Sequence, residues 1–389
     1  MDYFFNDDQK MIIELARKIA QEKVKPVREY YDETEEFPWP LVQEFAKSDL
    51  CGIYISEKYG GLGKGVFETC LAVEEIAKVD GAVALVLAAT ALGTIPIILF
   101  GNEEQKSKYL PDIAKGKKLV AFAVTEPNAG SDITSIQTTA KKKIKDNKEY
   151  YVLNGTKCFI TNAGEADIYV VIAITDKTKG ARGASAFILE KGMPGFTFGK
   201  KEKKMGIRAS ATRELIFDNC EVPKENLLGK EGHGFIITLK AFDSSRPGVA
   251  AQALGIATGA LEDALEYTRK RIQFGQPISS FQAIQHMLAN MATEIEAARA
   301  LLYATAKMID SNPEGRFTKE SAMCKLFCSD VAMRVTTDAV QLLGGYGYMR
   351  EYPMEKRMRD AKITQIYEGT NQIQRNEIAI ALIKETIRK

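Results

Sequence analysis

The spacing of apolar residues changes twice along the chain, and these two changes constrain the fold more than any other feature. Residues 1–120 space their apolar side chains as amphipathic helices do, whereas residues 121–228 contain short runs that alternate between apolar and polar side chains, as strands do. The helical spacing returns in residues 229–389. The sequence therefore predicts an α+β protein in which a β domain lies between two helical domains.

Charge and cysteine usage argue against several classes of protein. The chain has 53 Lys and Arg against 51 Asp and Glu, a net charge of +2, so no overall field favours nucleic acid or an anionic membrane. Its six cysteines form no CxxC motif and it has only two histidines, which disfavours a metal site, a disulfide framework and a His-dependent triad. Free thiols favour a reducing compartment, and the first residues do not resemble a signal peptide. We therefore expect a cytoplasmic protein.

One apolar segment, Gly81–Gly101, carries no charge and passes a crude test for a membrane span. It also contains Thr90, Gly93, Thr94 and Pro96. We expect a buried core segment, broken into two short elements near Gly93, and no membrane span.

Turn signals and helical spacing set the expected element boundaries. Asn154-Gly155 predicts a hairpin between the strand-like runs Tyr150–Leu153 and Cys158–Thr161. No GxGxxG motif follows a strand, which disfavours a Rossmann half. Helices are expected at Asp8–Lys25 (capped by Asn6 or Asp7), Leu41–Ser48, Val66–Val79, Ala250–Arg271, Phe281–Asp310, Lys319–Leu343, Arg357–Tyr367 and Asn371–Lys389.

A glutamate stands at the joint between the last two of these helices. Gly369 interrupts the helical pattern, and Asn371 is expected to cap the second helix with Gln374 as its capping-box partner. Glu368 would therefore be held by backbone at the end of a helix, as a general base must be fixed and yet accessible. The alternative is a solvated carboxylate at a helix end.

The same stretch, IYEGTNQIQR at Ile366–Arg375, resembles the C-terminal signature of the acyl-CoA dehydrogenases. These flavoenzymes introduce an α,β double bond into acyl-CoA thioesters. The resemblance is to the short- and medium-chain, butyryl-CoA dehydrogenase-like branch, and it implies that Glu368 removes the α-proton. It also implies an N-terminal helical domain, a middle β-barrel-like domain and a C-terminal four-helix bundle.

Two segments of the β domain resemble the flavin-binding motifs of that family. Thr125–Asp132 (TEPNAGSD) resembles the loop along the isoalloxazine ring, although by itself it could be a simple connection. Cys158–Asn162 resembles the second flavin strand, with Phe159 where many relatives carry Trp. The contacts that the resemblance implies with flavin, or with thioester for Ser131, are Phe122, Val124, Thr125, Gly130, Ser131, Phe159 and Thr161.

The segment Phe242–Pro247 resembles the family's substrate segment. In the isovaleryl and long-chain branches the base is the residue before the arginine of this segment. This chain has Ser245 there, which leaves Glu368 as the candidate base. The implied substrate contacts are Ser131, Asp243, Ser244, Ser245, Arg246 and Gly369.

The segment Arg269–Gly275 is basic, which by itself suits the C-terminus of a helix. The resemblance instead implies that Arg271 contacts the FAD pyrophosphate of a neighbouring subunit, a role for which its planar fork is suited. FAD bound across subunits implies an oligomer, and we expect a homotetramer. The further implied FAD contacts are Gln273, Phe274, Gln282, Gln341, Leu342, Gly344, Gly345, Thr370 and Gln372.

The reaction implied by the resemblance is FAD-dependent oxidation of an acyl-CoA to the 2-enoyl-CoA, with hydride passing to flavin N5 and electrons to an electron-transferring flavoprotein. Two alternatives are an acyl-CoA oxidase or flavin monooxygenase of the same fold, and a CoA-binding protein without catalysis. Ala88, Ala89 and Ala91 would leave room for a short, branched or cyclic acyl group. The sequence leaves the acyl group, the direction and the acceptor open.

Overall fold

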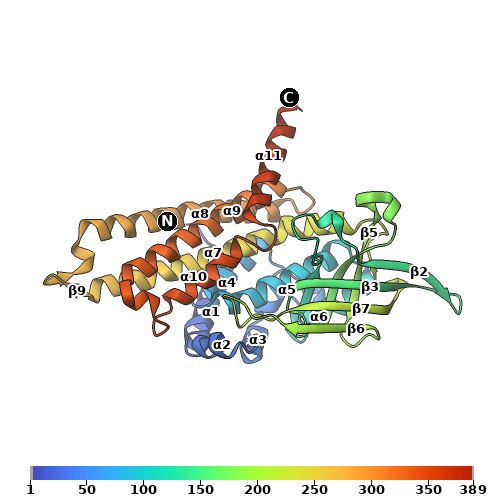
Figure 1. Ribbon diagram of the computed structural model, residues 1–389, viewed down its shortest axis with the longest axis horizontal. Coiled ribbons are helices and arrows are strands. Elements are labelled where there is room, and N and C mark those ends of the chain that lie inside the picture. Colours follow the sequence, from blue (N-terminus) through green and yellow to red (C-terminus); the bar gives the residue numbers. More distant parts are fainter. Residues whose placement is uncertain (1–2, 388–389) are drawn as a thin grey trace.

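The computed structural model describes residues 3–387, in which helices from both ends of the chain pack together and a mostly antiparallel sheet lies at one end of them (Figure 1). The expected α+β class is confirmed. The N-terminal helices are α1 (Asp7–Ile19), α2 (Arg28–Thr34), α3 (Trp39–Lys47), α4 (Val66–Ala77), α5 (Gly81–Phe100) and α6 (Glu103–Ala114). The C-terminal helices are α7 (Gly234–Lys270), α8 (Gln282–Ser311), α9 (Thr318–Leu343), α10 (Met354–Thr364) and α11 (Asn371–Ile387). The expected end of the last helix, Arg388 and Lys389, lies outside the described residues.

The sheet runs in the order β6-β7-β3-β2-β4-β5-β8, with β1 paired in parallel to β4. A separate two-stranded hairpin, β9 and β10, follows α7. The strands are β1 (Val120–Ala123), β2 (Thr139–Lys145), β3 (Lys148–Thr161), β4 (Ile168–Ile174), β5 (Ala184–Glu190), β6 (Phe196–Lys201), β7 (Thr212–Pro223), β8 (Leu227–Leu228), β9 (Ile272–Gln273) and β10 (Gln276–Pro277).

The expected hairpin at Asn154-Gly155 is wrong, because β3 runs straight through it. The turn lies earlier, at Asp146 and Asn147, whose φ angles of 51° and 61° suit a two-residue hairpin loop. Gly155 instead marks a break in the register between β3 and β7. A side chain at Gly155 would lie 2.6 Å from Oγ1 of Thr138, so the glycine permits a close backbone approach.

The apolar segment is one continuous helix, α5, so the expected break near Gly93 is wrong. Asp80 caps it by accepting hydrogen bonds from the backbone N–H groups of Ala82 and Val83. Gly93 lets the helix pack on β1, since a methyl group there would lie 2.6 Å from Cγ1 of Val120. Helix α5 is the one helix among residues 3–387 long and apolar enough to span a membrane, and 72% of its most apolar window is buried inside the protein. That burial is the behaviour of a core helix.

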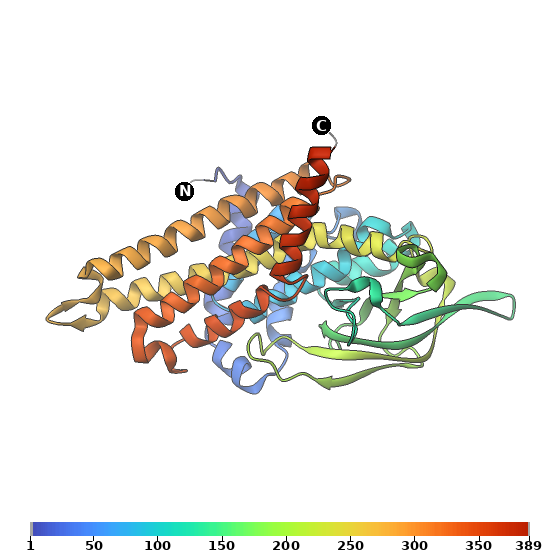
Figure 2. The ribbon, with the colours of Figure 1, turned by 45° about the horizontal axis from the view of Figure 1, so that its top comes forward.

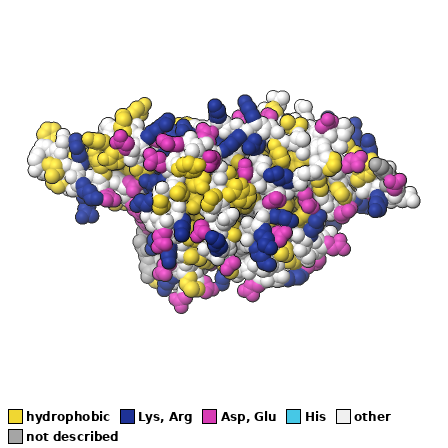
Figure 3. All heavy atoms as spheres, turned by 90° about the horizontal axis from the view of Figure 1, so that it is seen from below, with side chains coloured by type: hydrophobic (Ala, Val, Ile, Leu, Met, Phe, Trp, Pro, Cys, Tyr) yellow, Lys and Arg dark blue, Asp and Glu magenta, His cyan; other side chains and the backbone are white. Residues whose placement is uncertain are grey.

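Helix α7 begins earlier than the sequence predicted and runs through the segment Phe242–Pro247. It lies along α8 and α9 in the bundle, as Figure 2 shows, and also packs against α4 and α5. Residues of the substrate-like segment therefore project from a rigid helix at the point where the bundle meets the sheet. The face of the molecule in Figure 3 carries acidic and basic side chains in mixture, in keeping with the small net charge.

Candidate active site

The joint between α10 and α11 holds Glu368 in an unusual backbone conformation. Glu368 has φ 51° and Gly369 has φ 91°, so both are left-handed. For a non-glycine residue this conformation costs about 1–2 kcal/mol, and it persists only where the surroundings enforce it. Arg246 from α7 and Gln374 from α11 donate hydrogen bonds to the carbonyl oxygen of Glu368, at 3.4 and 3.0 Å.

The expected cap of α11 is wrong. Thr370 is the capping residue, because its Oγ1 accepts a hydrogen bond from the backbone N–H of Ile373 at 3.3 Å. Asn371 is buried and faces α9, where its Oδ1 accepts hydrogen bonds from Lys325 and Ser329. The side-chain amide of Gln374 reaches back to the joint instead of closing a capping box with Asn371.

The side chain of Glu368 points toward α7 rather than into bulk solvent. Its Oε2 accepts a hydrogen bond from Oγ of Ser245 at 2.8 Å, and the residue remains partly exposed. Burial raises the pKa of Glu368, while the Ser245 hydroxyl and the charges of Arg246 and Lys325 oppose that rise. A fixed, accessible carboxylate with a raised pKa has the properties of a general base.

The four expected substrate contacts in the segment Phe242–Pro247 have different surroundings. Arg246 is buried with its guanidinium 5.5 Å from the ring centre of Phe242, and burial lowers its pKa. Asp243 is buried and accepts a hydrogen bond from the backbone N–H of Phe317, so it fixes the start of α9. Ser245 faces Glu368, whereas Ser244 is partly exposed. Only Ser245 and Arg246 of this segment therefore contact the joint.

The first group of expected flavin contacts is assembled on β1, β3 and the loop after β1. Thr125 and Cys158 are joined by a backbone hydrogen bond of 2.9 Å, which brings the two flavin-like segments side by side. Phe122 and Val124 are buried, whereas Thr125 and Thr161 are partly exposed. Gly130 and Ser131 lie exposed on the loop.

Phe159 is the most unusual member of this first group. Its side chain is 69% exposed, and its φ of 57° is left-handed. A strained backbone that presents a bare aromatic ring between two buried neighbours, Cys158 and Ile160, fits a surface that is covered by a flat ligand.

A buried ion pair, which sequence reasoning missed, holds this first group together. Nζ of Lys157 on β3 donates to Oε1 of Glu126 at 2.7 Å and to the carbonyl of Val124 at 3.0 Å. Glu126 also accepts hydrogen bonds from the backbone of Gln137 and Thr138. Burial lowers the pKa of Lys157 to about 8. The available signal was a lysine directly before the strand-like run Cys158–Thr161.

The second group lies at the far end of the bundle, around the β9 hairpin (Figures 1 and 2). Here an open cleft of about 520 Å³ is lined by Arg271, Gln273, Gln341, Leu342, Gly344 and Gly345. The Arg271 guanidinium lies 5.5 Å from the ring centre of Tyr346. Phe274 is 92% exposed and Gln282 is also exposed. The bundle separates this group from the Glu368 joint, where Thr370 and Gln372 lie.

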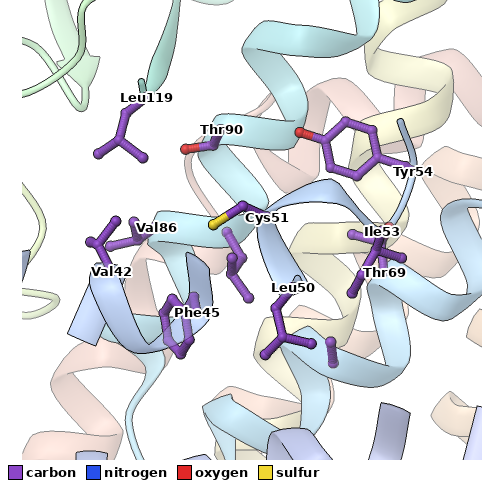
Figure 4. A pocket seen from close by; sticks show the side chains of 12 residues that line it. Val42, Phe45, Leu50, Cys51, Ile53, Tyr54, Thr69, Val86, Thr90 and Leu119 are labelled. Atoms are coloured by element: carbon purple, nitrogen blue, oxygen red, sulfur yellow. The ribbon is translucent and has the colours of Figure 1, made fainter. Parts of the chain in front are cut away.

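A second, enclosed cavity lies between α3, α4 and α5 (Figure 4). Its volume is about 10 Å³, and apolar side chains such as Val42, Phe45 and Leu50 line most of it. That space is close to one water molecule and too small for an acyl chain. Among residues 3–387, no cluster of three or more His, Cys, Asp or Glu side chains could hold a metal ion.

Comparison with known proteins decides the family. Three family models match in order: "Acyl-CoA dehydrogenase, N-terminal domain" over residues 6–117, "Acyl-CoA dehydrogenase, middle domain" over 121–220 and "Acyl-CoA dehydrogenase, C-terminal domain" over 232–383. The chain belongs to the acyl-CoA dehydrogenase family. The resemblance, the fold, the enzyme class and FAD as the cofactor are thereby confirmed.

Individual relatives of this acyl-CoA dehydrogenase family member cover nearly the whole chain. The short-chain-specific acyl-CoA dehydrogenase of Megasphaera elsdenii is 51% identical over 96% of this chain and 97% of its own. The structure of butyryl-CoA dehydrogenase from the same organism has a TM-score of 0.94 at 50% identity, covering 98% of this chain and 100% of that one. A chain in the structure described as "Electron transferring flavoprotein of Acidaminococcus fermentans" has a TM-score of 0.94 at 54% identity, covering 98% and 99%.

Proposed function

We propose that this chain oxidises a short-chain, branched or cyclic acyl-CoA to its 2-enoyl-CoA, with Glu368 as the base that removes the α-proton. The observation that carries the proposal is the Glu368 carboxylate, held by Ser245 at 2.8 Å on a left-handed joint and partly open to ligand. The family and the named short-chain relative support the same reaction.

The chain's own residues supply the proton chemistry. The α-hydrogen of a thioester is a very weak acid, so its removal needs help at the thioester carbonyl. We propose that the backbone N–H of Glu368 donates to that carbonyl while the Glu368 carboxylate takes the proton. When substrate excludes water, the pKa of Glu368 rises further toward the operating pH. Asp243 and Arg246 would help to hold the acyl-CoA, with Ser131, Ser244, Ser245 and Gly369 completing its binding site.

The residues present fit FAD. Exposed rings at Phe159 and Phe274, hydroxyls at Thr125 and Thr161, and Arg271 in an open cleft match the ring, the heteroatoms and the phosphates of that cofactor. When bound, FAD accepts the β-hydrogen as hydride. The residues proposed to hold it are Phe122, Val124, Thr125, Gly130, Ser131, Phe159, Thr161, Arg271, Gln273, Phe274, Gln282, Gln341, Leu342, Gly344, Gly345, Thr370 and Gln372.

We propose a homotetramer in which FAD is shared between subunits. Support comes from the distance along the bundle between the Arg271 cleft and the first flavin group. Helix α11 also projects from the body and exposes Ile380, Leu382 and Ile383, which a partner could cover. Sedimentation of the FAD-loaded enzyme tests this, and a monomer that keeps its FAD contradicts it.

Three further assignments belong to the same proposal. Electrons pass to an electron-transferring flavoprotein, which the description of one close structural relative supports. The protein is cytoplasmic, in keeping with its free buried cysteines. The chain divides into an N-terminal helical domain (1–120), a middle β domain (121–228) and a C-terminal bundle domain (229–389).

Flavin bleaching by a panel of acyl-CoA thioesters, from butyryl to cyclohexanecarbonyl, tests the function and identifies the acyl group. The Glu368→Gln variant is the control, expected to keep the yellow flavin and to lose about 10²- to 10⁴-fold in reduction rate. Full bleaching of that variant at the wild-type rate contradicts the role of Glu368. Stoichiometric peroxide without another acceptor identifies an oxidase, and a colourless protein that binds CoA thioesters identifies a non-catalytic relative.

A further inference from the structure

Lys325 on α9 is buried beside the catalytic joint without an acidic partner. Its side chain is 0% exposed, and its Nζ donates to the carbonyl of Gly369 at 2.8 Å and to Oδ1 of Asn371 at 2.9 Å. No ion pair with a carboxylate holds it among residues 3–387. A buried ammonium that makes no salt bridge is costly, and burial lowers the pKa of Lys325 to about 7 against the opposing charge of Glu368.

The need to satisfy nearby polar groups does not explain this lysine. The carbonyl of Gly369 already accepts a hydrogen bond from Gln374 at 2.9 Å, and Oδ1 of Asn371 already accepts one from Ser329 at 3.2 Å. An apolar side chain at position 325 would therefore leave neither acceptor without a donor. Replacement of an unpaired buried charge by an apolar group is often neutral or stabilising.

The charge of Lys325 has a clear effect on Glu368. The groups that face Glu368 are Ser245 and Arg246 from α7 and Lys325 from α9. Lys325 itself is faced by Glu368, by the like charge of Arg246 and by Asp330 on its own helix. Asp330 is already engaged by Gln365, Asn371 and Arg375, which tie the joint and α11 to α9.

We propose that Lys325 is a positioning residue for Glu368. Its ammonium holds the carbonyl of Gly369 toward α9, which stabilises the left-handed backbone of Glu368, and it places a positive charge close to the Glu368 carboxylate. The inference rests on the proposed function, because it assigns Lys325 to the base of that reaction. Lys325 acts through the joint and touches neither substrate nor cofactor.

Three substitutions separate the two contributions. Lys325→Met removes the hydrogen bond and the charge, Lys325→Gln keeps a donor without the charge, and Lys325→Arg keeps both. Lys319→Met is the matched control, since Lys319 lies on the same helix but pairs with Glu320 and Glu385 at the molecular surface. Each variant is measured as FAD-loaded enzyme for its flavin reduction rate, the pH profile of kcat/KM, the Kd of the 2-enoyl-CoA product and the thermal midpoint.

The expected result for Lys325→Met is a loss of about tenfold or more in the flavin reduction rate, because small misplacements of a base are costly. The acid limb of kcat/KM should move to higher pH, since the charge that favours the ionised carboxylate is gone. The Kd of the 2-enoyl-CoA product should stay at its wild-type value. The thermal midpoint should stay at or above that of wild type. Lys325→Gln should move the acid limb to higher pH with a smaller loss of flavin reduction rate than Lys325→Met. Lys325→Arg should keep the acid limb at its wild-type pH.

A purely structural lysine gives a different pattern. A lower thermal midpoint with an unmoved acid limb in both Lys325→Met and Lys325→Gln overturns the inference, as does a wild-type reduction rate in Lys325→Met. If Lys325→Met does not fold, the pH limb of Lys325→Gln decides. Failure of the proposed function is distinct, because the wild-type flavin is then not reduced by any acyl-CoA of the panel.

Discussion

The hydroxyl of Ser245 on α7 lies 2.8 Å from Oε2 of Glu368 on the joint between α10 and α11, although the two residues are 123 positions apart. A carboxylate mounted at position 245 could therefore reach the space that the Glu368 carboxylate occupies. Glu368→Ser alone should reduce flavin reduction by about 10²- to 10⁴-fold. Addition of Ser245→Glu should recover at least tenfold of that loss. A double variant that binds FAD but is no faster than Glu368→Ser contradicts this prediction.

Removal of the Ser245 hydroxyl should change the pH dependence of the reaction. That hydrogen bond favours the ionised form of Glu368 and so opposes the rise in its pKa that burial causes. Ser245→Ala should therefore move the acid limb of kcat/KM to higher pH. Ser311→Ala, at the exposed end of α8, is the control and should leave the limb in place.

The raised pKa of Glu368 also predicts how stability depends on pH. Because the pKa is higher in the folded state than in the unfolded state, the contribution of this carboxyl is fully present below its unfolded pKa. That contribution is lost as the pH rises through the folded pKa. Glu368→Gln cannot ionise, so its thermal midpoint relative to wild type should increase as the pH rises above 4.5, the ordinary pKa of a glutamate side chain. A difference in thermal midpoint between Glu368→Gln and wild type that is constant, or that falls as the pH rises, contradicts the raised pKa of Glu368.

Local sequence predicted the elements well where one strong local preference decided them. The first helix illustrates this, because Asn6 caps it, one of the two expected capping residues. In the structure Gln9 completes a capping box, and α1 passes at Ala20 into a short π-helical segment. The hairpin prediction at Asn154-Gly155 was wrong because the bulge in β3 needs the same backbone freedom as a hairpin turn. The prediction that Asn371 caps α11 was wrong because its side chain forms hydrogen bonds with α9 instead. No local sequence pattern indicates such a tertiary contact.

In the candidate site too, the features set by local sequence were predictable and those set by tertiary contacts were not. The position of Glu368 on a bend was predictable, since Gly369 breaks the helical pattern within a few residues of it. The side chains that hold the bend were not, because Lys325 reaches the carbonyl of Gly369 from α9, and Gln374 turns back to the bend instead of pairing with Asn371. The ion pair of Glu126 and Lys157 was not predicted for a similar reason, since it depends on how the loop after β1 folds back on β3.

The buried pair of Glu126 and Lys157 should matter for both stability and FAD. Glu126→Gln leaves Lys157 buried without a counter-ion, which typically costs about 3–5 kcal/mol. We expect a clearly lower thermal midpoint and weaker retention of FAD, because the loop from Thr125 to Asp132 loses its anchor. The matched control is Glu149→Gln, which breaks pairs with Lys142 and Lys224 at the protein surface and should leave both measurements unchanged. Lys157→Met in the Glu126→Gln background should recover part of the midpoint.

Two glycines, Gly93 within α5 and Gly248 on α7 where it faces α5, should respond in opposite ways to substitution by alanine. A methyl group at Gly93 would lie 2.6 Å from Cγ1 and 2.9 Å from Cβ of Val120. Strand β1 cannot easily yield because it is paired with β4, so Gly93→Ala should cost about 1–3 kcal/mol and lower the thermal midpoint. A methyl group at Gly248 on α7 meets only Cβ of Ala88, at 3.8 Å. Gly248→Ala should therefore leave the midpoint unchanged or raise it, since alanine favours a helix by about 1 kcal/mol over glycine. Equal midpoints for the two variants would contradict the close packing of α5 on β1.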